Sequence, residues 1–133
     1  MNANVQNSTG EVEVVVTPEM TAVLDGIEIH PVYSTFWLAY HAEVAARRAI
    51  AAFFDGDENA VGSGLQLTHL AMAGIGARVR IVARVDAVEG RRIRCSIEAR
   101  VLPSGTLLAT GTQDQVVLPQ QVLTEKVRQA AIT

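Results

Sequence analysis

The sequence predicts one α+β domain, in which an antiparallel sheet of five or six strands wraps round a single long helix. Three observations support this: a long helical segment without a breaker, a series of alternating segments joined by short turns, and a composition suited to one core. The 133 residues are 49% hydrophobic and 19% charged, with a mean hydropathy of +0.22. A chain of this length buries roughly two-thirds of its extended surface, which is enough for one domain.

The long helix is predicted over residues 35–54. This segment is rich in alanine, contains no glycine or proline, and ends before the run Asp55-Gly56-Asp57. Apolar residues lie on nearly every side of it. We therefore expect other structure to surround this helix rather than to cover one face.

Strands are predicted where apolar and polar residues alternate or β-branched residues gather, over residues 11–17, 60–71, 77–88, 92–101 and 107–118. Glu89-Gly90 and Pro103-Ser104-Gly105 mark short turns between them. Thr17-Pro18 indicates a helical turn, and residues 27–34 read as irregular. Residues 1–10 are expected to form a disordered N-terminal tail, so the domain spans 11–133, with residues 119–133 either helix or tail.

Such a small sheet has exposed edges, and pairing the edges of two copies across a two-fold axis removes them. A curled sheet round a central helix, dimerised in this way, is the hot-dog architecture. We therefore expect a homodimer, with a tetramer as a further option.

Composition also bounds the partners and the compartment. Eleven Lys and Arg stand against fourteen Asp and Glu, a net charge of −3, which offers no basic field for nucleic acid or a membrane surface. The single cysteine, Cys95, and the polar start without a signal-peptide pattern fit the cytoplasm. The most apolar stretch, 44–54, is split by Arg47-Arg48 and is too short to span a bilayer.

Two polar residues stand in apolar surroundings. His69 shares a strand face with Leu65 and Leu67, which is the face expected to meet the helix. On the helix, the neighbours of Glu43 at three, four and seven residues are largely apolar: Phe36, Ala39, Tyr40, Ala46, Arg47 and Ile50. If helix and sheet pack face to face, Glu43 and His69 could share one buried space suited to acid–base chemistry.

Structural interpretations of these residues stand beside the functional one. Glu43 and Arg47 have the spacing of a helix ion pair, and a lone histidine on an apolar strand face is more often a hydrogen-bonded core residue. Thr35 is a candidate N-cap, and Cys95 is expected to be inert core packing. The histidine and carboxylate spacings match no metal site, so no metal is expected.

The segments HPVYSTFWLAYHAEVAARRAI and VGSGLQLTHLAMAGIGARVRI resemble the fluoroacetyl-CoA thioesterase family of hot-dog acyl-CoA thioesterases. That family carries a threonine before the long helix, a glutamate eight residues later and a histidine on the following strand. Thr35, Glu43 and His69 stand at the same spacings, eight and twenty-six residues apart. The resemblance covers about residues 14–117 and includes the VEGRR hairpin at 88–92.

The resemblance implies hydrolysis of a short or medium acyl-CoA, or an aryl-CoA, to the free acid and CoA, with no cofactor besides the coenzyme A thioester that is the substrate. Glu43 would act as general base on water, or as nucleophile through an acyl-enzyme anhydride. His69 would assist proton transfer, and Thr35 would orient water or substrate. Gly62 and Phe36 are expected to contact the acyl group, and basic residues at the pocket mouth are expected to contact the CoA phosphates: Arg47, Arg48, Arg91 and Arg92.

Helical geometry restricts this constellation, because eight residues of one straight helix separate Thr35 from Glu43 by about 12 Å. The two can share a site only if Thr35 lies in the preceding loop and folds back, or if a dimer partner contributes. The segment between residues 16 and 35 is shorter than the family's lid, and Gln115 stands where the family has an arginine, so selectivity for a fluorinated acyl group is not predicted. Two alternatives stay open: a non-catalytic module that binds acyl-CoA or another apolar ligand, and a hot-dog enoyl-CoA hydratase.

Overall fold

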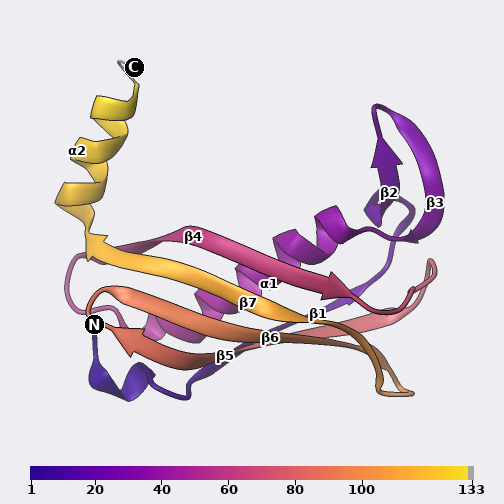
Figure 1. Cartoon of the computed structure of the whole chain (residues 1–133), viewed down its shortest axis with the longest axis horizontal. Helices are drawn as coiled ribbons and strands as arrows, with labels where there is room; N and C mark the ends of the chain where they lie inside the picture. The colour runs from indigo at the N-terminus through magenta and orange to yellow at the C-terminus, as the bar shows by residue number, and fades with distance from the viewer. Residues whose placement is uncertain (132–133) are drawn as a thin grey trace.

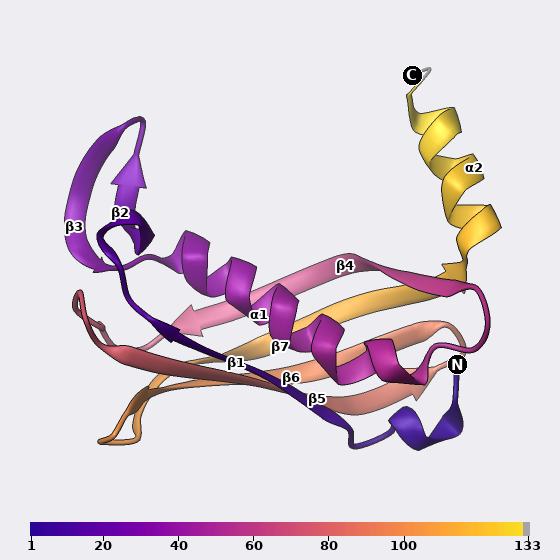
Figure 2. The same ribbon diagram turned by 180° about the vertical axis from the view of Figure 1, so that it is seen from behind.

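A curled antiparallel sheet lies against one side of the helix α1 (Thr35–Ile50) in the computed structural model, which describes residues 1–131 (Figures 1 and 2). The strands are β1 (Thr9–Val15), β2 (Thr21–Leu24), β3 (Ile27–Tyr33), β4 (Glu58–His69), β5 (Arg78–Glu89), β6 (Arg92–Leu102) and β7 (Thr106–Pro119). Five of them form the main sheet in the order β1-β5-β6-β7-β4, and β2 with β3 forms a separate hairpin. The predicted hot-dog fold with five antiparallel strands is confirmed.

Helix α1 begins after Ser34, whose hydroxyl accepts a hydrogen bond from the Trp37 amide at 3.1 Å. Its buried face consists mainly of alanine, with Leu38 and Ile50 at its two ends. These small side chains allow β1 to approach so closely that a Cβ on Gly10 would lie 2.3 Å from the Ala49 backbone nitrogen. The packing of helix on sheet therefore depends on a glycine at this position.

The expectation that α1 is surrounded on all sides is wrong within this chain. Phe36 is 74% exposed and Tyr40 is 54% exposed, because five strands curl over only one side of the helix. Figure 2 shows α1 lying uncovered in front of the sheet. An apolar flank of the helix, next to the edge strand β4, is left open.

The inner face of the sheet follows the predicted alternation. Residues Val79, Ile81, Ala83 and Val85 of β5 and Ile93, Cys95, Ile97 and Ala99 of β6 are buried against the helix. The arginines of both strands point outward, as expected. Burial raises the pKa of the Cys95 thiol to about 12, which fits the expected role in packing.

Two local predictions need correction or completion. Residues 27–33 are not irregular but form β3, which pairs with β2 through a turn at Asp25 and Gly26, both with positive φ. An Asp-Gly pair is typical of a hairpin turn, but the sequence analysis interpreted it as the end of a helical turn because β2 was not predicted. The last segment is a helix, α2 (Gln120–Ala130), and residues 132–133 of the expected domain lie outside the described residues.

The first ten residues do not form a disordered tail. Ala3–Val5 make a 3₁₀ turn, and Val5 is 1% exposed in the core. The Ser8 hydroxyl also donates to the Ala49 carbonyl at 2.6 Å, and β1 already starts at Thr9. Burial of Val5 and the hydrogen bonds from Asn2 to Phe53, Asn7 to Val85 and Ser8 to Ala49 together order the segment. None of the helices in residues 1–131 is long and apolar enough to cross a membrane.

Candidate active site

The first group of predicted site residues lies where α1 begins and β4 ends. Thr35 is the first residue of α1 and His69 the last residue of β4, and the Thr35 Oγ1 and His69 Nδ1 atoms are 3.0 Å apart. Thr35 is not the N-cap, because the preceding residue, Ser34, takes that role. A cavity of about 300 Å³ adjoins the pair, lined by both strands of the hairpin and by the segment after β4, including His30 and Met72.

The imidazole of His69 is available for proton transfer. Its Nε2 atom is buried and has no hydrogen-bond partner within residues 1–131. Burial lowers the pKa of His69, and the backbone of Ala71 opposes part of that shift. The ring is therefore neutral near pH 7 and has a nitrogen free to accept or donate a proton.

The second group surrounds Glu43, in the middle of α1. The Gln113 side-chain Nε2 donates to Glu43 Oε2 at 2.9 Å, and a Cβ on Gly62 would stand 2.9 Å from the same oxygen. The alternative ion pair with Arg47 is not formed within 4 Å in the part of the chain that the structure describes. Arg47 instead donates to Asn59 Oδ1 at 2.7 Å. The neutral amide of Gln113 thus holds the Glu43 carboxylate against the backbone of Gly62, which has no side chain.

A second cavity, of about 460 Å³, opens beside this carboxylate. It is lined by Glu43, Val44, Arg47, Arg48, Ala51, Ala60, Gly62 and Gln115. Its apolar wall comes from small side chains, and its rim carries two arginines. Such a space, with a carboxylate on one wall, suits a small acyl group attached to an anionic carrier.

The two groups are not brought together within one chain, so the expectation of one shared space for Glu43 and His69 is wrong for the single subunit. Eight residues separate Thr35 from Glu43 on α1, a rise of about 12 Å. On β4, seven residues separate Gly62 from His69, roughly 23 Å of extended strand. We call the pair Thr35–His69 and the group Glu43–Gly62–Gln113 the two half-sites.

Gln113 was not among the residues singled out from the sequence. It is 1% exposed and is the direct partner of Glu43. Its Oε1 atom is buried, and no residue in the described part of the chain bonds to it. Side chains alternate between the two faces of a strand, and this alternation places Gln113 and Gln115 on the core-facing side of β7. That pattern could have identified Gln113 from the sequence. Gln115, where an arginine was expected, donates to the Ala46 carbonyl at 3.2 Å and so anchors the helix backbone.

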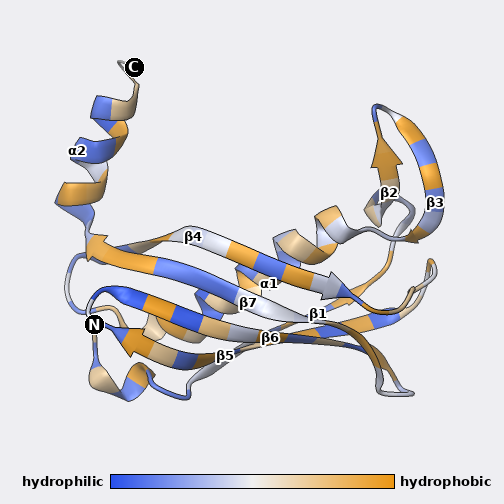
Figure 3. Ribbon diagram, viewed as in Figure 1, coloured by the Kyte–Doolittle hydropathy of each residue, from blue (hydrophilic) through white to orange (hydrophobic). Residues whose placement is uncertain are grey.

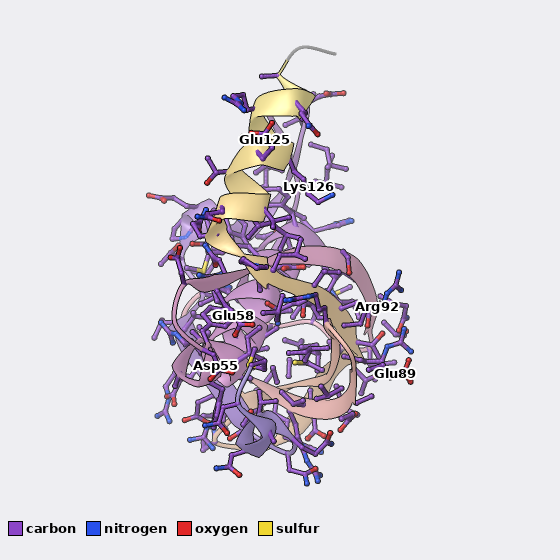
Figure 4. The ribbon with its side chains drawn as sticks, turned by 90° about the vertical axis from the view of Figure 1, so that its left-hand side faces the viewer. Asp55, Glu58, Glu89, Arg92, Glu125 and Lys126 are labelled. Carbon is purple, nitrogen blue, oxygen red and sulfur yellow. The ribbon has the colours of Figure 1, made fainter. Side chains whose placement is uncertain are left out.

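The remaining predicted contacts lie outside both half-sites. Phe36 is exposed next to Thr35 on the open flank of α1. Arg91 donates to the Val117 carbonyl at 3.2 Å and lies 3.9 Å from Glu58. Arg92 points from the outer face of the sheet, beside Glu89 in Figure 4, so the structure does not bring it to Glu43 in the same chain.

Comparison with known proteins agrees with this geometry. The curled five-stranded sheet over one helix is the hot-dog fold of the thioesterase superfamily. The chain belongs to the family described as fluoroacetyl-CoA-specific thioesterase, whose pattern matches residues 16–121. It is 28% identical over 102 residues to the fluoroacetyl-CoA thioesterase of Streptantibioticus cattleyicolor, covering 77% of this chain and 72% of that protein.

Two solved structures illustrate the similarity. A hypothetical protein of Thermus thermophilus, described as a thioesterase superfamily member, has a TM-score of 0.90 at 37% identity over 95% of this chain and 92% of its own. A mutant of the fluoroacetyl-CoA-specific thioesterase, solved with fluoroacetate and CoA, has a TM-score of 0.79 at 26% identity over 90% of this chain and 97% of its own. Thioester hydrolysis is therefore the activity associated with this family.

Proposed function

We propose that this protein hydrolyses a short or medium acyl-CoA, or an aryl-CoA, to the free acid and CoA. The observation that carries the proposal is the Glu43 carboxylate, held by Gln113 against Gly62 at the wall of a cavity. The two buried polar side-chain atoms that lack partners within residues 1–131 also belong to the half-sites: His69 Nε2 and Gln113 Oε1. Unpaired buried polar groups cost about 1–3 kcal/mol each, and a role in binding or catalysis accounts for keeping them.

In this proposal Glu43 is either the general base that activates water or the nucleophile that attacks the thioester carbonyl. The first route forms the acid directly, whereas the second passes through an anhydride that water then cleaves. In either route the leaving CoA thiolate takes up the proton that water gives up, and His69 carries that proton between them. Thr35, bonded to His69 Nδ1, orients the ring and the substrate. Gly62 gives the acyl group access to the carboxylate because it has no side chain.

We further propose that the working unit is a homodimer paired along β4. Within the described residues β4 is hydrogen-bonded on one side only, to β7, and it exposes Val61 and Leu65. An antiparallel pairing about an axis near Leu65 would set Gly62 of one chain opposite the partner's His69. Each complete site would then combine Glu43 of one chain with the Thr35–His69 half-site of the other, and would cover the open flank of α1.

We propose that the cavity of about 460 Å³ beside Glu43 receives the acyl group. Arg47 and Arg48 at its rim are the basic residues we propose for the CoA phosphates. With Gln115 bonded to the helix backbone, no selectivity for a fluorinated acyl group is proposed. We keep the cytoplasm as the proposed compartment.

The direct test is thiol release from acetyl-, fluoroacetyl-, butyryl-, octanoyl- and phenylacetyl-CoA by the wild type and by Glu43→Gln. The variant keeps the shape of the side chain but removes the base, so turnover of every accepted ester should fall by at least about 100-fold. Full activity in the variant would refute the mechanism. No release from any ester, combined with thermal stabilisation by acyl-CoA, would favour a binding module instead.

A further inference from the structure

Helix α2 has too little packing to be stable on its own. Of its eleven residues, Leu123 is buried, whereas Val127 is 69% exposed and Val122 is also exposed. Its neighbours in the chain are the adjoining ends of β7 and β4, and Figure 1 shows it standing clear of the sheet. Because isolated helices shorter than about 12–15 residues are marginal in water, α2 needs a second surface.

The opposite end of the molecule carries an uncovered apolar surface. We name it the hairpin patch: Leu24, Ile27 and Ile29 of the hairpin, with Leu70, Met72 and Ile75 of the segment after β4. Leu24 is 68% exposed and Met72 is 76% exposed. Figure 3 shows apolar bands along both hairpin strands, and a two-stranded hairpin is itself marginal without a packing partner.

The positions of α2 and the hairpin fit each other across a two-fold axis. Figures 1 and 2 show that both project past the β4 edge, toward the same side but from opposite ends of the sheet. An antiparallel pairing of two β4 strands exchanges the ends. It therefore places α2 of one chain at the end of the partner that carries the hairpin patch.

The charges of the two surfaces are also complementary. The segment 18–34, which contains the hairpin, holds three acidic residues and no lysine or arginine: Glu19, Asp25 and Glu28. Helix α2 holds Lys126 and Arg128 against Glu125. Arg128 is ion-paired with Glu125, and Lys126, labelled beside the helix in Figure 4, is the other cation. Segment 18–34 is thus net acidic, α2 carries a net charge of +1, and both expose apolar side chains.

We propose that α2 packs on the hairpin patch of a second copy of this chain. This inference rests on the proposed β4 pairing. The patch adjoins the cavity beside Thr35 and His69, which is lined by residues of the hairpin and by Leu70 and Met72. The partner's α2 thereby holds the hairpin against this half-site and helps to enclose the acyl group.

A photo-crosslinking experiment tests the contact in the full-length protein. Val127→Cys is labelled with a benzophenone maleimide, since the native Cys95 is buried and unreactive. Isotopically heavy and light chains are mixed, irradiated and analysed by mass spectrometry. Val15→Cys, on the far edge strand β1, is the matched control with similar exposure.

We expect heavy-to-light crosslinks from position 127 to residues 21–33 or 70–76, and no inter-chain crosslink from position 15. Light scattering establishes whether the protein is dimeric. In a dimer, crosslinks within one chain, crosslinks to another surface, or no crosslinks would overturn this inference but not the proposed dimer. A monomer would overturn it together with the proposed dimer. Thiol release is measured separately, so a failure of the proposed chemistry does not alter this readout.

Discussion

At the scale of single residues, the site is organised by what touches Glu43. Its Oε2 atom accepts a hydrogen bond from a glutamine rather than from a cation, since Arg47 is bonded to Asn59 instead. The Gln113 amide, a neutral donor, fixes the position of this carboxylate oxygen. Gln113 is thus proposed as the positioning residue for the base.

Replacing Gln113 should affect turnover more than binding. Gln113→Leu removes one hydrogen bond to the carboxylate, worth about 1–1.5 kcal/mol, and should lower kcat roughly tenfold with little change in KM. The measurement is steady-state thiol release, with Gln6→Leu as control, because Gln6 is exposed and its amide bonds the Asp86 carbonyl away from β4. An unchanged kcat for Gln113→Leu would show that Glu43 needs no such support.

Gly62 should be intolerant of even one methyl group. The added Cβ would lie 2.9 Å from Glu43 Oε2, so the carboxylate must shift, and we expect kcat to fall roughly 10- to 100-fold in Gly62→Ala. The matched control is Gly64→Ala, whose Cβ would meet Asp114 on the outer face at 3.2 Å. An equal loss of kcat in both variants would mean that an added methyl group disturbs strand β4 itself and that the shift of Glu43 is not the cause.

A buried pair elsewhere on α1 makes stability depend on pH. The Tyr33 hydroxyl lies 2.6 Å from His41 Nδ1, and burial lowers the pKa of His41 below its ordinary value of 6.5. Burial also raises the pKa of Tyr33 above its usual range, so the protonated hydroxyl donates to the neutral ring. The unfolded chain therefore binds a proton more readily than the native chain.

The pair should raise the free energy of unfolding above pH 6.5. This contribution should be lost as the pH falls from 6.5 through the lowered pKa of His41. Urea unfolding at pH 7.5 and pH 5 should show a larger loss in the wild type than in His41→Gln, which cannot titrate. The same loss of unfolding free energy in both proteins would exclude His41 as its source.

At the scale of elements, the sequence predicts well whatever follows from local periodicity. The strands from β4 to β7 and the long helix lie within a few residues of the predicted bounds, because their apolar residues alternate or repeat clearly. The hairpin of β2 and β3 was missed because Asp25-Gly26, its turn, was interpreted as the end of a helical turn. The ordering of residues 1–8 was missed because it depends on Val5, whose burial is a tertiary contact.

The approach of β1 to α1 gives a test at this scale. A Cβ on Gly10 would meet helix backbone at 2.3–2.4 Å, where no side chain can yield. Gly10→Ala should therefore reduce stability by about 2–3 kcal/mol and lower Tm by roughly 10 °C, as measured by circular dichroism. Gly74→Ala, which meets no atom within 4 Å, is the control. A Tm within about 2 °C of the wild type would contradict this packing.

At the scale of the whole molecule, the two half-sites raise the question of which chain supplies each residue. The spacing of Thr35, Glu43 and His69 suggested one site, which stays a prediction: the structure brings Thr35 to His69, and Glu43 lies with Gln113. Helix rise correctly predicted that Thr35 and Glu43 are far apart in one chain. The contact of Thr35 with His69, and of Glu43 with Gln113, depends on sheet register, which the sequence alone does not provide. The homodimer stays a prediction. The structural reason for it is that Glu43 and the Thr35–His69 pair lie apart within one chain.

Mixing two inactive variants tests this account most directly. Glu43→Gln and His69→Ala chains are unfolded together, refolded as a mixture and assayed for thiol release. If each site combines Glu43 of one chain with His69 of the other, half of the dimers carry one intact site, and about a quarter of wild-type activity should return. Activity no higher than that of the separate variants, in a mixture shown by mass spectrometry to contain heterodimers, would contradict a site shared between subunits.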